Sequence, residues 1–255
     1  MKKIISICMA LVSLISILSL TSCSQADIDL TRKSNVYDDF AKFINSPDDY
    51  AGKTVALTST YMSVYNYSKN KVTRHTMVAN DTTGKKRALY EIRTADGKYP
   101  MTGSDVTVYG TIHQNRYIEV ERFSGEKYIM DFEIDALDLT PEELTSFINT
   151  YRTEYSASES YGKTIRIYGH LSTVEDGITF LVGLDGNGKY LWDIELYDPE
   201  GKFIYPSASG TEVNTVEVIG ELGTYTSKNV IYACIKVQQV GKSESVFKED
   251  IVINQ

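Results

Sequence analysis

The chain is dominated by short segments in which β-branched and aromatic residues alternate with polar ones. Glycine, proline, asparagine and aspartate gather between these segments, a composition typical of strands joined by turns. Ten segments fit this description, and they fall into two groups of five. The predicted strands are residues 54–64, 71–78, 87–93, 106–113 and 116–122 in the first group, and residues 164–174, 178–184, 190–197, 213–222 and 230–240 in the second.

A helix is predicted in front of each group of strands. Ahead of the second group, Thr140 can cap a helix that has Pro141 in its first turn and Glu143 three residues after the cap, the arrangement called a capping box. The apolar residues of each helix fall on one face. They are Leu144, Phe147, Ile148 and Tyr151 in the second helix, and Tyr37, Phe40, Ala41 and Ile44 in the first.

The two groups are copies of one sequence unit. Gly52-Lys53-Thr54 at the first strand of one copy recurs as Gly162-Lys163-Thr164 in the other. A Val-x-Val-x-Gly strand later ends at Gly110 in the first copy and at Gly220 in the second. Both pairs of glycines are therefore 110 residues apart, and the matches keep their order. The sequence indicates a duplicated domain.

The repeated unit resembles the bacterial OB-fold domains found in lipoproteins and permease-associated proteins. The residues that carry this resemblance are Tyr161-Gly162-Lys163-Thr164, Gly169, Val216, Val218 and Gly220 in the second copy, and Tyr50, Gly52-Lys53-Thr54, Val106, Val108 and Gly110 in the first. The resemblance implies that Gly169 permits a bulge that bends the long first strand. The first copy has Ser59 at the corresponding position.

The expected fold is mainly β with short helices: two tandem five-stranded OB-fold-like antiparallel barrels, each preceded by a helix. The expected organisation is a signal peptide over residues 1–22, a flexible tether over 23–34, a first OB-like domain over 35–134 and a second over 135–255. The last residues, from Gly241, could add an edge strand or pack against the second barrel. Some relatives carry a cysteine pair in the third strand. Here that strand reads Tyr90-Glu91-Ile92 and Trp192-Asp193-Ile194, so a thiolate metal site does not carry over.

The N-terminus has the layout of a secretory signal. Lys2 and Lys3 precede an uncharged, mostly apolar run from Ile4 to Leu20. The following Leu20-Thr21-Ser22-Cys23 resembles the bacterial lipobox, which implies cleavage before Cys23 and attachment of a diacylglyceryl group to its thiol. Two acyl chains give stable anchoring. We therefore expect a lipid-anchored protein on the extracytoplasmic face of the cell membrane.

Two other interpretations of this segment stay open. The apolar run approaches the roughly 20 residues that a membrane-spanning helix needs, so it could be an uncleaved anchor. An ordinary signal peptide could also be removed, leaving Cys23 unmodified. Fatty-acid labelling distinguishes lipidation of Cys23 from both of these interpretations.

The net charge disfavours general nucleic-acid binding. The full chain has a formal charge of −8, and residues 1–22 contain two lysines and no acid, so the remainder carries −10. Such a surface repels phosphate backbones. Of the three cysteines, only Cys23 and Cys234 follow the signal, so lipidation of Cys23 leaves no partner for a disulfide. Cys234 lies in a strand-like run and is expected to be a packed side chain.

No motif in the sequence marks a catalytic, metal or cofactor site. His75, His113 and His170 are far apart and lack metal-ligand spacing, and we expect them on strand surfaces. Asp185 and Asn187 lie in a glycine-rich stretch that lacks the twelve-residue calcium pattern, so a tight hairpin turn is expected there.

Aromatic residues are the most informative candidates for binding, because the chain has 19 tyrosines and one tryptophan. OB barrels bind ligands on the face of their second and third strands. The candidate ligand-binding residues are Tyr65, Tyr67 and Tyr90 in the first copy and Tyr190, Trp192 and Tyr197 in the second. Ordinary strand packing is the alternative role for these side chains.

The sequence favours a non-enzymatic binding or protein-interaction module of the cell envelope. Its expected partners are the membrane, through Cys23, and an envelope protein or a small ligand. The alternatives are an envelope hydrolase with unmarked carboxylates and, less favoured, an oligonucleotide- or oligosaccharide-binding protein. The net charge argues against the oligonucleotide.

Overall fold

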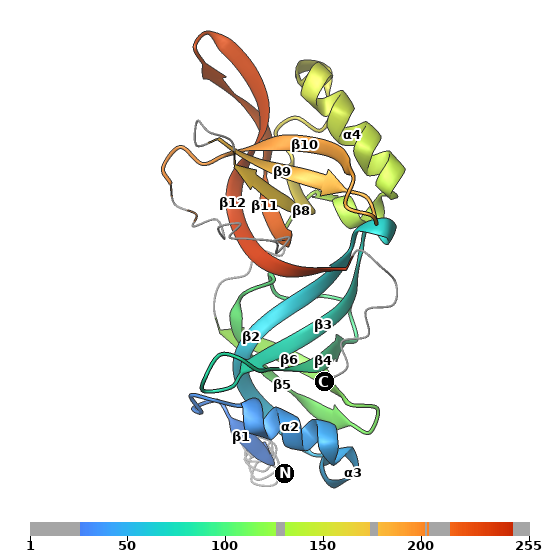
Figure 1. Cartoon of the computed structure of the whole chain (residues 1–255), viewed down its shortest axis with the longest axis vertical. Helices are drawn as coiled ribbons and strands as arrows, with labels where there is room; N and C mark the ends of the chain where they lie inside the picture. Colours follow the sequence, from blue (N-terminus) through green and yellow to red (C-terminus); the bar gives the residue numbers. More distant parts are fainter. Residues whose placement is uncertain (1–25, 126–130, 174–177, 202, 204–214, 247–255) are drawn as a thin grey trace, which may run out of the picture.

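The chain forms two six-stranded sheets with a few short helices, which confirms the predicted mainly β fold (Figure 1). The computed structural model describes residues 26–125, 131–173, 178–201, 203 and 215–246. The predicted signal peptide and Cys23 lie outside these residues, so the predicted lipidation site is not among the described residues. Among the described residues, no helix has the length and apolar character needed to span a bilayer.

The first half contains strands β1 to β6. Its elements are β1 (Ile28–Leu30), α2 (Tyr37–Asn45), α3 (Pro47–Tyr50), β2 (Thr54–Asn66), the 3-10 turn η1 (Tyr67–Lys69), β3 (Lys71–Asn80), β4 (Arg87–Thr94), β5 (Asp105–His113) and β6 (Tyr117–Gly125). The second half contains strands β7 to β12. Its elements are β7 (Ile134–Asp135), η2 (Ala136–Asp138), α4 (Pro141–Glu154), η3 (Tyr155–Ala157), β8 (Thr164–Thr173), β9 (Thr179–Leu184), β10 (Tyr190–Tyr197), β11 (Thr215–Ser227) and β12 (Val230–Val246).

Strand pairing follows the same order in both halves. In the first, β2 pairs with β3, β3 with β4, β4 in parallel with β6, β6 with β5, and β5 returns to β2. In the second, the corresponding circuit is β8, β9, β10, β12, β11 and back to β8, again with one parallel pair, β10 with β12. A short strand adds in parallel to the first strand of each circuit, β1 to β2 and β7 to β8.

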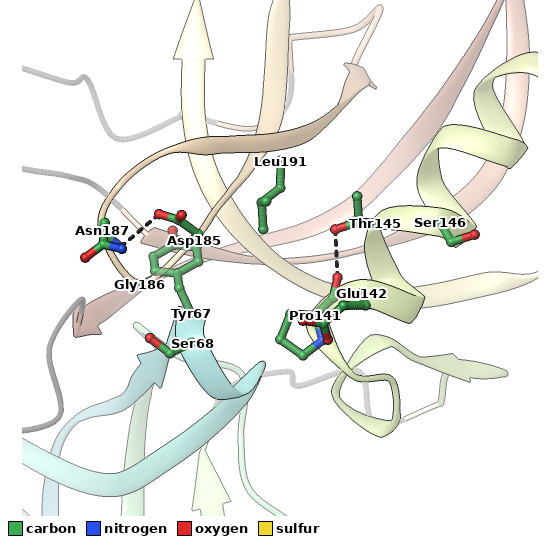
Figure 2. Close-up of a pocket in the computed structure, with 10 residues that line it drawn as sticks. All are labelled: Tyr67, Ser68, Pro141, Glu142, Thr145, Ser146, Asp185, Gly186, Asn187 and Leu191. Carbon is green, nitrogen blue, oxygen red and sulfur yellow. Dashed lines mark hydrogen bonds between the residues drawn. The ribbon is translucent and has the colours of Figure 1, made fainter.

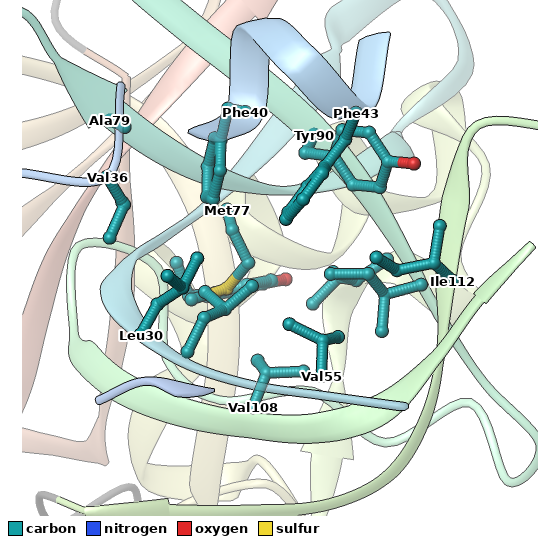
Figure 3. Close-up of a cluster of buried hydrophobic side chains, with 14 of the residues drawn as sticks. Leu30, Val36, Phe40, Phe43, Val55, Met77, Ala79, Tyr90, Val108 and Ile112 are labelled. Atoms are coloured by element: carbon teal, nitrogen blue, oxygen red, sulfur yellow. The ribbon is translucent and has the colours of Figure 1, made fainter. Parts of the chain in front are cut away.

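Each half has its own apolar core beneath its helix. Figure 3 shows the first core, in which Phe40 and Phe43 of α2 lie over Met77 and Tyr90. In the second half, α4 contributes Leu144, Ile148 and Tyr151 to the core. The buried face of α4 agrees with the predicted stripe, except that Phe147 is only partly buried.

The caps and turns follow from local sequence. Thr140 Oγ1 accepts a hydrogen bond from the backbone N–H of Glu143, and the Glu143 carboxylate accepts one from the backbone N–H of Thr140, which confirms the capping box. In the turn between β9 and β10, Asp185 Oδ1 accepts hydrogen bonds from the backbone N–H groups of Asn187 and Lys189, both at 2.8 Å. The predicted hairpin turn is therefore confirmed.

Two details differ from the sequence predictions. Ile28–Leu30 form strand β1, and Leu30 is buried in the first core, so part of the segment expected to be a flexible tether is an ordered strand. The register of β8 with β11 runs without a shift from Thr164 to His170, so Gly169 does not mark a bulge. A Cβ at Gly169 would lie 2.6 Å from Leu181 Cγ, so this glycine instead allows β9 to approach closely.

The last strand joins the two halves. β12 continues through the tail, and its residues 244–246 pair in parallel with Val64–Asn66 of β2. Hydrogen-bonded strands therefore run without interruption from one sheet into the other. In Figure 1 the curved β12 passes beneath the second half and meets the upper end of β2. The tail was expected either to add an edge strand or to pack against the second barrel. Its described part forms a strand, which extends the sheet of the first half.

Candidate functional site

The junction between the halves is built from buried polar contacts at one end of β2. Ser63 and Ser243 lie 2.9 Å apart through their hydroxyl oxygens, although 180 residues separate them in sequence. The backbone N–H of Ser63 donates to Thr102 Oγ1 at 2.9 Å, and the Thr102 hydroxyl donates to the carbonyl of Lys242 at 2.9 Å. Since buried polar groups are costly to leave unpaired, these contacts define one relative position of the halves.

A tyrosine cluster forms the apolar part of the junction. The rings of Tyr65 and Tyr168 stack with centroids 4.9 Å apart, and Tyr67 meets Tyr65 edge-on at 4.9 Å. All three side chains are buried. The Tyr67 hydroxyl also lies 3.1 Å from Thr215 Oγ1 in the second half. Residues from both halves therefore share one small core.

Asn70 joins the turn after η1 to the start of the second half. Its Nδ2 donates to the carbonyl oxygens of Ala136 and Leu139, each at 2.6 Å, and its Oδ1 accepts from the Tyr65 hydroxyl at 2.5 Å. The residue has a left-handed backbone with φ 44°, which asparagine tolerates better than most residues. One buried amide thus satisfies the Tyr65 hydroxyl in its own half and two carbonyl groups across the junction.

Charged groups lie on another side of the junction. Arg166 forms an ion pair with Asp135, and its guanidinium stacks on the Phe132 ring at 4.6 Å. Glu217 is buried, and its Oε2 accepts a hydrogen bond from the backbone N–H of Thr102 at 2.9 Å. Burial raises the pKa of the Glu217 carboxyl, and this effect exceeds the opposing effects of the Thr102 hydrogen bond and the Arg166 charge.

His75 belongs to this region and is half-buried, which corrects its expected place on a strand surface. Its ring stacks on Tyr99 with centroids 3.4 Å apart, and its Nδ1 lies 2.7 Å from the Tyr61 hydroxyl. Burial and the nearby Arg166 charge lower the pKa of His75 to about 4. The ring is therefore neutral at physiological pH.

A groove opens beside the tyrosine cluster (Figure 2). Its volume is about 750 Å³, within the usual range for ligand sites. One wall is the turn after β2, the second is the first turns of α4, and the third is the β9–β10 hairpin with the start of β10. The lining residues are Tyr67, Ser68, Pro141, Glu142, Thr145, Ser146, Asp185, Gly186, Asn187 and Leu191.

The groove offers hydrogen-bonding groups and negative charge. Four lining side chains carry a hydroxyl group, one carries an amide, and Glu142 and Asp185 carry carboxylates, while no basic side chain is among the described lining residues. In Figure 2 the Thr145 hydroxyl donates a hydrogen bond to the Pro141 carbonyl, and the Asp185 carboxylate accepts one from the backbone N–H of Asn187 in the same turn. This lining suits a neutral or cationic ligand that can hydrogen-bond to hydroxyl groups.

The six aromatic residues selected from the sequence occupy four different environments. Tyr65 and Tyr67 meet at the junction, and Tyr67 lines the groove. Tyr90 is buried in the first core and Trp192 in the second, where a Cβ at Gly183 would lie 2.1 Å from the indole ring. These two are packing residues, which corrects their selection as candidate ligand contacts.

Tyr190 and Tyr197 lie on the outer surface of the second half. Tyr190 is 51% exposed. Tyr197 stacks on Tyr225 at 4.5 Å, and Tyr225 stacks on Tyr232 at 5.4 Å. Tyr225 and Tyr232 were not selected from the sequence. The two tyrosines lie opposite each other on β11 and β12. Recognising these two strands as a hairpin would have identified them as a cross-strand pair.

Cys234 is a packing residue of the second half. Cys234 is buried, as expected, and burial raises the pKa of its thiol to about 12, which disfavours the nucleophilic thiolate. Across the described part of the chain, no group of three or more histidine, cysteine, aspartate or glutamate residues is arranged to hold a metal ion.

Comparisons with known proteins place the chain in no family. No family model and no curated protein matches it. A solved structure described as "Structural mimicry for functional antagonism" is 11% identical, with 73% of this chain and 95% of that chain covered and a TM-score of 0.19. A second, "Molecular basis for abrogation of activation of pro-inflammatory cytokines", is 10% identical, with coverages of 72% and 92% and a TM-score of 0.18. Superpositions this poor carry no argument about fold or function.

Proposed function

We propose that the protein is a lipid-anchored, non-enzymatic binding module on the extracytoplasmic face of the membrane, built from two OB-fold-like barrels that act as one rigid body. Its ligand or partner contacts both halves in the groove beside Tyr67. The observation that carries this proposal is that one groove has walls from both halves and that the halves are joined by a continued strand and buried hydrogen bonds.

The strand order supports the OB-fold part of the proposal. An OB fold is a five-stranded, partly open Greek-key barrel. The circuits formed by β2–β6 and by β8–β12 each contain five strands and include one parallel pair between the third and fifth. The short strands β1 and β7 and the preceding helices are additions to this unit.

The rigid junction supports a binding role. A ligand that meets a preformed surface loses less free energy to ordering of the protein than one that must bring two mobile domains together. The tyrosine cluster and Asn70 hold η1 against the start of the second half, which sets the distance between the groove walls. Each half thus contributes part of one site.

The groove is tested by filling it. Ser68 is exposed on η1 and lines the groove, so Ser68→Trp is expected to obstruct it, while Ser156→Trp at exposed Ser156 of η3 adds the same bulk outside the groove. Titration calorimetry would use a neutral N-acetylhexosamine tetrasaccharide and a lysine tripeptide as probes. Binding of either probe that weakens at least tenfold in Ser68→Trp alone supports the groove, and recovery of the probe unchanged excludes hydrolysis. Binding unaffected by Ser68→Trp, or no binding of either probe, contradicts this site.

The anchor is tested separately by labelling cells with a radioactive fatty acid. Replacing Cys23→Ala is expected to abolish incorporation into the protein. Cys8→Ala, within the apolar run of the signal, is expected to leave labelling intact. Retained label in Cys23→Ala would exclude lipidation at this residue.

A further inference from the structure

A second cavity lies at the junction and shares no lining residue with the groove. Its volume is about 260 Å³. The first half contributes the loop between β4 and β5, and the second half contributes β7, β8, β11 and the residues before β7. The lining residues are Gly97, Lys98, Tyr99, Met101, Asp131, Phe132, Asp135, Arg166, Glu217 and Ile219.

Arg166 is held rigidly in this cavity and has hydrogen-bonding capacity left. Asp135 accepts hydrogen bonds from Nε and Nη2, and the Phe132 ring lies against the guanidinium. A guanidinium has five N–H donors, and within the described residues those on Nη1 are not used. The side chain is 24% exposed, so these donors can meet a molecule in the cavity.

Lys98 adds a second positive charge to the wall. It is exposed, and its side chain forms no ion pair with an acid in the part of the chain that the structure describes. Arg166 and Lys98 come from opposite halves. An anionic group in the cavity can therefore be bound from both sides of the junction.

The same cavity carries negative groups. Asp135 already pairs with Arg166, while Asp131 is exposed beside it. Glu217 is 3% exposed and is fixed by the backbone N–H of Thr102. A ligand carrying only negative charge would be repelled by the carboxylates of Asp131 and Asp135, and one carrying only positive charge would be repelled by Arg166 and Lys98.

We propose that this cavity binds a small zwitterion, an α-amino acid with an apolar side chain, whose carboxylate is bound by Arg166 and Lys98 and whose ammonium group faces the Asp131 carboxylate and a carboxyl oxygen of Glu217. Tyr99, Met101, Phe132 and Ile219 supply apolar wall for the side chain. The volume corresponds to about nine water molecules at about 30 Å³ each, which suits a free amino acid better than a larger ligand. This inference does not depend on the groove or on the anchor.

The test compares an amino acid with analogues that each lack one charge. Purified protein would be titrated with L-leucine and L-phenylalanine, with the N-acetyl derivative of each, which lacks the ammonium group, and with the amide of each, which lacks the carboxylate. At least one of the two amino acids is expected to bind saturably. Both analogues of the preferred amino acid are expected to bind at least tenfold more weakly than the amino acid itself.

A variant that leaves the junction intact provides the second arm. Lys98→Ala removes an exposed side chain and is expected to weaken binding of the amino acid about tenfold without changing the melting temperature of the free protein. Lys85→Ala, at an exposed turn of the first half outside the cavity, is expected to bind as the wild type does. Absence of binding by both amino acids overturns the proposal, as does equal affinity for the preferred amino acid and either of its singly charged analogues, or an affinity unchanged by Lys98→Ala.

Discussion

The carbonyl oxygen of Thr102 lies 1.9 Å from the position that a Cβ atom would take on Gly241. Thr102 belongs to the first half and Gly241 to β12, so the two backbones touch where the halves meet. Any side chain at position 241 would separate them and strain the adjacent hydrogen bond from Thr102 to the Lys242 carbonyl. The close contact is therefore a requirement of the joined arrangement.

Replacing Gly241→Ala is expected to destabilise the protein by about 1–3 kcal/mol, the usual range for inserting atoms into a packed region. Urea unfolding followed by tyrosine fluorescence and circular dichroism would measure the loss. Lys242→Ala alters the neighbouring, exposed side chain and is expected to change stability little. If Gly241→Ala unfolds at the same urea concentration as the wild type, the contact between the halves is looser than described.

Strands were the part of the fold that the sequence predicted well. Alternation of apolar and polar residues located all ten strands of the two circuits, and the deviations are confined to the ends. β1 was missed because Ile28-Asp29-Leu30 is too short to show a period. Its strand geometry depends on pairing with β2, which is a tertiary contact that local sequence does not reveal.

The candidate site was predicted only in part. Tyr65, Tyr67, Tyr90 and Trp192 look alike in sequence, since each is an aromatic residue in or beside a strand. Which ones reach the junction depends on which face of each sheet meets the other half. The partners that decide this are distant in sequence, as Ser63 and Ser243 are, and Tyr168 was not considered because its neighbour Tyr65 lies in the other copy.

Asn70→Gly separates the backbone role of this residue from its side-chain role. Glycine tolerates the left-handed backbone, but the three hydrogen bonds to Tyr65, Ala136 and Leu139 are lost. With about 1 kcal/mol for each hydrogen bond and a further cost for buried groups left unpaired, we expect a loss of about 2–4 kcal/mol.

Thermal unfolding measured by calorimetry would test the Asn70 prediction. Because the halves lose part of their connection, the single transition of the wild type is expected to broaden or divide into two. Asn115→Gly, in the exposed turn between β5 and β6, serves as the matched control and should melt as the wild type does. A sharp, unshifted transition for Asn70→Gly would show that the amide does not couple the halves.

Glu217→Gln is expected to change the pH dependence of stability. Burial raises the pKa of Glu217, so the folded protein binds this proton more tightly than the unfolded chain does. The stabilisation that the protonated Glu217 carboxyl contributes is complete below the ordinary carboxyl pKa. It is lost as pH rises through the raised pKa of the folded protein. The glutamine keeps an acceptor for the Thr102 N–H and cannot ionise, so the stability of the variant relative to wild type should increase with pH.

Urea unfolding at pH 5 and pH 8 would measure this trend. Glu119→Gln, at an exposed position on β6, is expected to follow the wild type at both pH values. If the stability of Glu217→Gln relative to wild type falls as pH rises, the carboxylate, rather than the carboxylic acid, is the form that the junction prefers.

His75→Phe is expected to reduce the sensitivity of the protein to mild acid. The pKa of His75 is lowered to about 4 by burial and by the Arg166 charge, so the folded state favours the neutral ring. The stabilisation from the neutral His75 ring is complete above the ordinary histidine pKa of 6.5 and is lost as pH falls from 6.5 towards 4. At about 1.4 kcal/mol per pKa unit, this loss amounts to at most about 3 kcal/mol. Phenylalanine keeps an aromatic ring against Tyr99 and cannot be protonated, so its stability should fall less than that of wild type between pH 7 and pH 4.5 in urea unfolding. The control His113→Phe leaves His75 in place, so it should lose as much stability in acid as the wild type does. If His75→Phe loses the same amount of stability as wild type, groups other than His75 cause the acid sensitivity.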